Sequence, residues 1–176
     1  VAFQAILGPG DDMMLFAPYW PPIRDMITMP QARPVMIPTS SARRNGITET
    51  LEHLSTPNTR AIYYNTPQNP SGLVFSRQEA EEVAAFAIKH NLVVVADEAY
   101  EDLVYEGEHV SIASLPGMAE RTITCYTFSK TYAMTGWRIG YAVAKDPFMA
   151  GLRKLVLVST NVVSTQHQWA ALEALT

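Results

Sequence analysis

Lys130 and Arg138 are the two side chains whose types and spacing point most directly to chemistry. Lys130 follows an apolar run that ends in small hydroxyl residues, and Arg138 comes eight positions later. A lysine in a confined site forms a Schiff base with a carbonyl compound, and an arginine beside it binds an anionic group such as a phosphate. The pair therefore suggests covalent chemistry next to a bound anion, and the spacing alone does no more than suggest it.

Two further polar positions stand where apolar runs end. Asn69 lies in the segment 65–72, whose two prolines and one glycine predict a rigid turn. Asp97 directly follows the apolar run 92–96, where a carboxylate is unfavourable unless it meets a partner. Beside a pyridine nitrogen such a carboxylate keeps the nitrogen protonated. The residues alone leave plainer roles open: a strand-to-helix loop for Asn69, a helix N-cap for Asp97, and core packing for the nearby Tyr100.

Alternating apolar runs and helical patterns predict the elements that position these side chains. Ser76 and Glu79 match a capping box that starts one helix, and Pro147 stands at the start of another. Strands alternating with helices predict an α/β fold, a three-layer doubly wound sheet that is mostly parallel. The last strand follows a short turn, which favours an antiparallel course. The expected strands are 13–17, 34–37, 60–64, 92–96, 122–126 and 139–144.

A doubly wound sheet also predicts where these polar groups meet. Ligands of open α/β sheets bind beyond the carboxyl ends of the strands. Asn69, Asp97 and Lys130 each follow one of three successive predicted strands. We therefore expect all three to line one edge of the sheet and to share a site.

Three segments, taken in order, resemble those of a known enzyme family. They are Asn-Thr-Pro-Gln-Asn-Pro-Ser-Gly at 65–72, Ala-Asp-Glu-Ala-Tyr at 96–100, and Phe-Ser-Lys-Thr-Tyr-Ala-Met-Thr-Gly-Trp-Arg-Ile-Gly at 128–140. The chain resembles class I/II pyridoxal-phosphate enzymes of the aspartate aminotransferase type, which have fold type I. Because members are more than twice as long, the resemblance implies that residues 1–176 are the central part of the cofactor-binding large domain, without the small domain. We expect these residues by themselves to be inactive.

The resemblance also implies roles for the polar residues at the ring of pyridoxal 5'-phosphate. Lys130 would form the Schiff base with the cofactor, and its free amine would carry a proton during the reaction. Asp97 would contact the pyridine nitrogen. Asn69 and Tyr100 would contact the phenolic oxygen of the cofactor.

Four other residues have roles implied by the same resemblance. Arg138 and Thr127 would bind the cofactor phosphate, and Ser129 is a weaker candidate for that contact. Trp20, in Ala17-Pro18-Tyr19-Trp20, would stack on the pyridine ring. Pro21 and Pro22, which follow it, differ from the residues that the family often has there. The resemblance therefore implies the stacking of Trp20 but not the side-chain contacts next to it.

The activity that the resemblance implies is amino-group transfer between an L-amino acid and a 2-oxo acid, by a homodimer. Two other classes of function stay open. A pyridoxal-phosphate-dependent lyase, or a relative of cyclopropane-carboxylate synthases, would share these residues, since the cofactor carries the reaction and the pocket selects it. The aminotransferase-like effector domain of a transcription regulator is the third possibility, although the Thr-Gly-Trp-Arg-Ile-Gly sequence at 135–140 looks more like the enzymes.

Composition narrows the choice of partners. The 176 residues are 48% hydrophobic and 17% charged, with a net charge of −4 and no basic cluster, which argues against nucleic-acid binding. No apolar run reaches the ~18 residues that span a bilayer, and no signal peptide opens the chain, so we expect no membrane partner and a cytoplasmic location. Cys125, the single cysteine, is expected to be buried and inert.

Three acidic residues are expected at the surface, and the four histidines are expected to have surface or helix-capping roles. Glu98, Glu101 and Asp102 fit a solvated helix face better than a catalytic cluster. The histidines have no metal-ligand spacing, so no metal site is expected; they are His53, His90, His109 and His167.

Overall fold

The six predicted strands form one sheet in a computed structural model that describes residues 1–176. Their order in space is β2-β1-β3-β4-β5-β6. The first five strands are parallel, and β6 runs antiparallel to β5, which confirms the predicted mostly parallel sheet with one reversed strand. The strands are β1 Asp12–Ala17, β2 Arg33–Pro38, β3 Thr59–Asn65, β4 Val93–Asp97, β5 Thr122–Thr127 and β6 Gly140–Val143.

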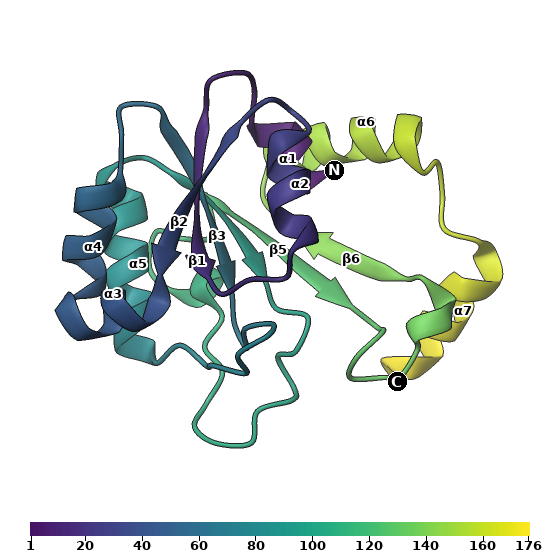
Figure 1. Ribbon diagram of the computed structural model, residues 1–176. Coiled ribbons are helices and arrows are strands. Elements are labelled where there is room, and N and C mark those ends of the chain that lie inside the picture. The colour runs from purple at the N-terminus through teal and green to yellow at the C-terminus, as the bar shows by residue number, and fades with distance from the viewer.

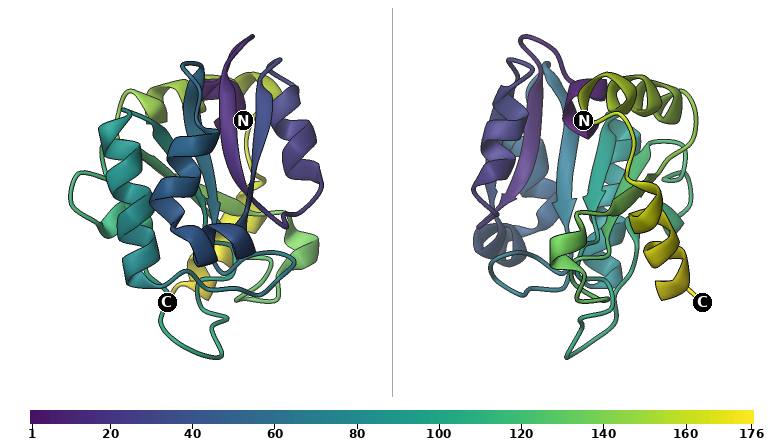
Figure 2. Two further views of the ribbon diagram at one scale, coloured as in Figure 1. Left: turned by 60° about the vertical axis from the view of Figure 1, so that its left-hand side comes forward. Right: turned by 90° about the vertical axis from the view of Figure 1, so that its right-hand side faces the viewer.

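Helices cover both faces of this sheet, as Figures 1 and 2 show. Successive strand residues point to opposite faces. Ile62 and Tyr64 of β3 therefore join the larger core, under α3 (Thr39–Asn45), α4 (Ile47–Leu54) and α5 (Arg77–Lys89). Ala61 and Tyr63 join the smaller core, under α1 (Ala2–Ile6) and α2 (Pro22–Thr28). The structure thus has the three predicted layers.

Some helices begin where the sequence predicts a helix start, and others were not predicted. Ser76 and Glu79 form the predicted capping box of α5: the Ser76 side chain accepts from the Glu79 backbone N–H, and the Glu79 carboxylate accepts from that of Ser76. Helices α2 and α3 were not predicted. Helix α2 begins at Pro22, because proline is tolerated in the first turn of a helix. Helix α3 buries only Thr39 and Ala42, too few residues to give an apolar period.

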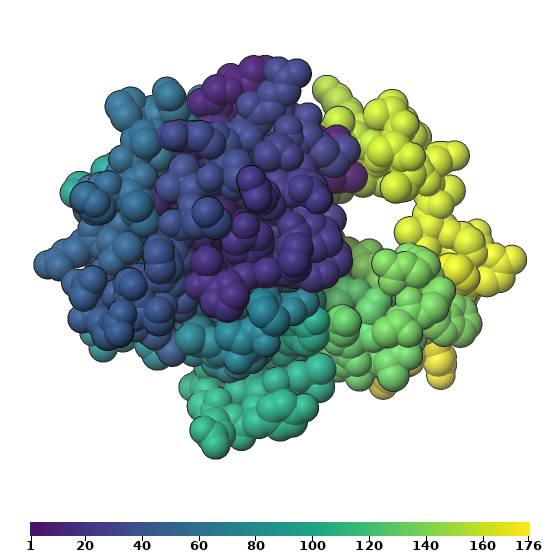
Figure 3. All heavy atoms as spheres, viewed as in Figure 1, coloured from purple at the N-terminus to yellow at the C-terminus, as the bar shows by residue number.

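The last two helices, α6 (Phe148–Ser159) and α7 (Thr165–Ala174), lie at the far end of the sheet. Of the apolar residues of α6, only Leu152 is buried, and α6 packs against α1. Val158 is 81% exposed, and Trp169 of α7 is 66% exposed. Figure 3 shows an opening that these two helices and the rest of the chain enclose. By length and hydropathy, no helix qualifies as a membrane span.

Candidate functional site

The ends of the parallel strands meet at one edge, as predicted. Asn65 of β3 pairs with Asp97 of β4, and Asp97 pairs with Cys125 of β5. Thr127 is the last residue of β5, and it pairs with Gly140, the first residue of the antiparallel strand β6. A Cβ atom on Gly140 would lie 2.5 Å from the carbonyl oxygen of Tyr126, so this close approach of two backbones requires glycine. Lys130 and Arg138 lie in the connection between β5 and β6, at the same edge.

Asp97 is held by two hydrogen bonds at the end of β4. The Tyr63 hydroxyl donates to Oδ2 at 2.5 Å, and the Ala99 backbone N–H donates to Oδ1 at 3.2 Å. Burial raises the pKa of the Asp97 carboxyl above its ordinary value, while the bonds from Tyr63 and Ala99 act in the opposite direction. Tyr63 was not among the predicted site residues. Its signal in the sequence is a tyrosine two positions before the end of an apolar strand.

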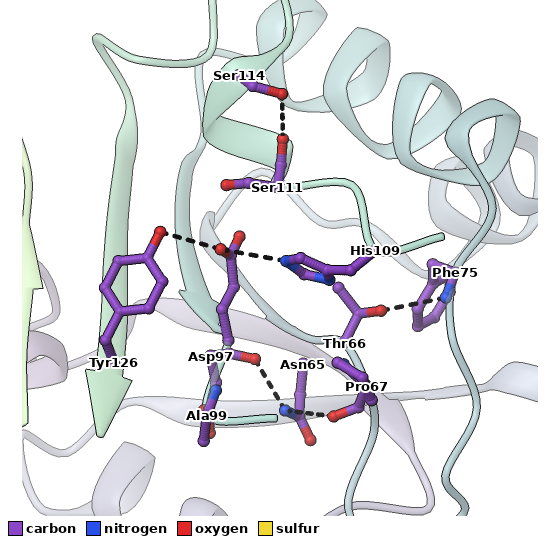
Figure 4. Close-up of polar contacts among 11 residues, drawn as sticks. Asn65, Thr66, Pro67, Phe75, Asp97, Ala99, His109, Ser111, Ser114 and Tyr126 are labelled. Atoms are coloured by element: carbon purple, nitrogen blue, oxygen red, sulfur yellow. Dashed lines mark hydrogen bonds and ion pairs between the residues drawn. The ribbon is translucent and has the colours of Figure 1, made fainter. Parts of the chain in front are cut away.

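Asn65 fixes the loop that carries Asn69. Its Nδ2 atom donates to the carbonyl oxygens of Asp97 at 2.9 Å and Pro67 at 3.2 Å, contacts that Figure 4 shows. Its Oδ1 atom accepts from the Asn69 backbone N–H at 2.8 Å. The Asn69 side chain in turn lies 3.5 Å from the Tyr100 hydroxyl. The structure therefore brings Asn69 and Tyr100 together, and Asn65 is a supporting residue that sequence reasoning did not single out.

Lys130 lies beside this pair. Its Nζ atom is 5.4 Å from the centre of the Tyr100 ring, within the range of a cation–π contact. The Lys130 side chain is exposed and forms no ion pair with a carboxylate. Its amine is therefore free to react at the edge of the sheet.

A cavity of about 300 Å³ opens where Asp97 ends β4. Trp20, Asp97 and Thr127 all line it, and most of its wall is apolar, including Phe3 and Ile23. A largely apolar cavity with a single carboxylate suits a flat heteroaromatic ring that carries a basic nitrogen. The donor set therefore fits the ring of pyridoxal phosphate. Asn69 and Tyr100 line a separate cavity. Lys130, Ser129 and Arg138 line neither of these two cavities.

Of the three predicted phosphate-binding residues, two are in contact with each other and the third is not. The Ser129 backbone N–H donates to the Thr127 hydroxyl at 3.2 Å, and the Ser129 side chain is buried. Arg138 is exposed, and its guanidinium donates to the Thr135 carbonyl at 2.9 Å. Arg138 has the left-handed backbone conformation, with φ 52°, which is unfavourable for a side chain other than glycine. No hydrogen bond joins Arg138 to Thr127 or Ser129.

Glu98 and His109 correct two sequence expectations. Residues 99–102 form turns rather than a helix, and Glu98 is 1% exposed instead of solvated. Strand alternation turns Glu98 away from Asp97, toward Tyr126, whose hydroxyl donates to it at 3.1 Å. The ring of His109 lies 3.4 Å from the same carboxylate, so it is not at the surface (Figure 4). Potential metal-ligand atoms of Glu98, Glu101 and His109 lie within 4.8 Å of one another, a cluster that their spacing in the sequence did not reveal.

Cys125 lies on the cavity wall and is only partly exposed. Burial is the main cause that raises its thiol pKa to about 12. At neutral pH the thiol therefore stays protonated, which agrees with the expected inert cysteine.

The family model for "Aminotransferase class I and II" matches residues 1–176. The chain belongs to this family. It is 40% identical to a probable aspartate/prephenate aminotransferase of Thermus aquaticus, over 99% of this chain and 45% of that protein. It is 36% identical to kynurenine–oxoglutarate transaminase 3 of Rattus norvegicus, over 98% of this chain and 40% of that protein.

Solved structures of aminotransferases have the same fold. The aromatic aminotransferase of Pyrococcus horikoshii OT3 superimposes with a TM-score of 0.93 at 35% identity, over 99% of this chain and 48% of that one. Thermus thermophilus aspartate aminotransferase with maleate also gives a TM-score of 0.93, at 37% identity, over 99% of this chain and 46% of that one. The chain thus spans less than half the length of these relatives.

Proposed function

We propose that the protein is a pyridoxal-phosphate-dependent aminotransferase, which transfers an amino group between an L-amino acid and a 2-oxo acid. The observation that carries the proposal is the meeting of Asp97, Tyr100 and Lys130 at one sheet edge, beside a largely apolar cavity. Residues 1–176 would form the central part of the cofactor-binding large domain of a cytoplasmic homodimer.

The proposal gives the residues at the ring separate tasks. When bound, pyridoxal phosphate supplies an aldehyde that condenses with amines and a ring that accepts electrons. Lys130 would hold the cofactor covalently and then move a proton at the substrate Cα as a free amine. Asp97 would keep the ring nitrogen protonated. Asn69 and Tyr100, which already face each other, would hold the phenolic oxygen.

Trp20 and the phosphate-binding residues would orient the cofactor. The Trp20 indole, 45% exposed at the rim of the cavity, would cover one face of the ring and exclude water from it. Thr127 and Ser129 would donate to the phosphate. Arg138 would add a bidentate contact, for which its guanidinium must leave the Thr135 carbonyl.

Lyase or synthase chemistry and a regulatory effector role are less well supported. The relatives described above bear aminotransferase or transaminase names, and the family model is that of aminotransferases. A test of the proposal is a half-reaction with the cofactor-loaded full-length protein, because residues 1–176 are not expected to be active by themselves. Addition of amino acids one at a time is expected to convert the absorbance of bound pyridoxal phosphate to that of pyridoxamine phosphate, with release of the 2-oxo acid. No conversion across acidic, aromatic and small amino acids would refute transamination, and release of ammonia instead would indicate a lyase.

A further inference from the structure

Tyr63 is a buried tyrosine whose hydroxyl points at the carboxylate of the site. It lies on β3, is 4% exposed, and donates to Asp97 Oδ2 at 2.5 Å. Its ring packs edge-on against the Phe3 ring of α1, with ring centres 5.9 Å apart and planes at 77°. Strand and helix together therefore fix where the hydroxyl lies.

The hydroxyl of Tyr63 is the only side-chain donor to Asp97. The other carboxylate oxygen accepts from the Ala99 backbone N–H, so both oxygens are held. Glu98 is the charged neighbour that disfavours the ionised carboxylate, while the Cys125 thiol and Tyr100 also lie close to this pair. Burial and Asp97 raise the pKa of the Tyr63 hydroxyl far above its ordinary value. Tyr63 therefore keeps its proton and remains a donor at neutral pH.

We propose that Tyr63 is a positioning residue of the reaction, whose hydroxyl fixes the Asp97 carboxylate toward the cavity and favours its ionised form. The proposal rests on the proposed function, because Asp97 acts there on the ring nitrogen. A hydroxyl that donates to a carboxylate stabilises the charged form more than the neutral acid. Without it, burial and Glu98 would favour a protonated Asp97, which cannot balance a charged ring nitrogen.

Tyr64 offers a matched control. It follows Tyr63 on the same strand, is fully buried, and points to the opposite face of the sheet. Its hydroxyl has no hydrogen-bond partner. Replacement of either tyrosine by phenylalanine removes one buried oxygen, but only Tyr63→Phe removes a bond to Asp97.

The first readout is the titration of Asp97 itself, without cofactor, by NMR of protein labelled with ¹³C at the aspartate carboxyls. Loss of the donor in Tyr63→Phe is expected to raise the Asp97 pKa by about one unit, and Tyr64→Phe is expected to leave it unchanged. The ring and its packing on Phe3 persist in Tyr63→Phe, so the fold should be kept. An unchanged Asp97 pKa in Tyr63→Phe, or an equal rise in both variants, would overturn the role of Tyr63.

The second readout is the kinetics of the cofactor-loaded full-length protein. Without its donor, Asp97 would be less well placed to balance the ring nitrogen, so kcat of Tyr63→Phe is expected to fall about tenfold, while KM changes less than about twofold. Equal kcat values in wild type and Tyr63→Phe would overturn the role of Tyr63 and leave the proposed function standing. Failure of the wild type to bind pyridoxal phosphate at Lys130 would overturn the proposed function, and with it the catalytic role of Tyr63, even if the Asp97 pKa shifts.

Discussion

Replacement of Lys130 by alanine is expected to lower kcat/KM for transamination by at least about 10⁴-fold, the upper range for loss of a positioned acid–base group. The variant loses both the covalent hold on the cofactor and the amine that moves the proton at the substrate Cα. Because the Lys130 side chain is exposed, makes no ion pair and loses only its contact with the Tyr100 ring, its removal should lower stability by no more than about 1 kcal/mol. Steady-state kinetics and thermal unfolding of the same preparation would measure both effects.

Lys154 provides the control for this prediction. It is an exposed lysine on α6. Lys154→Ala is expected to keep kcat/KM within about twofold of wild type, as is usual for a surface change away from the site. A Lys130→Ala variant that retained more than a tenth of wild-type activity would rule out Lys130 as the reactive amine.

Asp97→Asn is expected to lower kcat/KM by at least about 100-fold. Removal of one member of a buried charge pair is unfavourable by about 3 kcal/mol or more, and 1.36 kcal/mol corresponds to a factor of ten. Asparagine has nearly the same shape, and its oxygen can still accept from Tyr63 or Ala99. Stability should therefore be kept, or rise, because the buried charge is gone. Kinetics with saturating cofactor, together with denaturant unfolding, would separate the two effects.

The matched variant is Asp102→Asn, in the exposed part of the turn after β4. It carries the same chemical change and should leave the kinetics within about twofold of wild type. Activity of Asp97→Asn within about fivefold of wild type would mean that this carboxylate does not act on the ring nitrogen.

Much of the fold was predictable because the sheet is built from apolar runs with clear ends. The run 92–96 predicted β4, and Ser76 with Glu79 predicted where α5 begins. The shared edge followed from topology alone, since parallel strands with covered faces end on the same side. Helices α2 and α3 were missed because both are short and neither has a side-chain cap: α2 buries only Ile23 and Ile27, and α3 buries only Thr39 and Ala42.

The place of the site in the fold was predictable from the sequence, but the hydrogen bonds among its side chains were not. The sequence indicated that Asn69, Asp97 and Lys130 share an edge, but the roles of Tyr63 and Asn65 depend on which strands are neighbours. Glu98 was misplaced because its charge suggested solvent, whereas strand alternation carries it into the interior to meet Tyr126. The direction of the Arg138 side chain depends on a left-handed backbone conformation that no residue pattern indicates.

The most direct test is to find where the full-length protein binds pyridoxal phosphate. The purified full-length protein would be incubated with the cofactor, reduced with borohydride to trap any Schiff-base linkage, and digested for peptide mapping. Modification is expected to be confined to Lys130, with none in Lys130→Ala. Labelling spread over surface lysines such as Lys145 and Lys154, or no labelling of the wild-type protein, would contradict a Schiff base at Lys130.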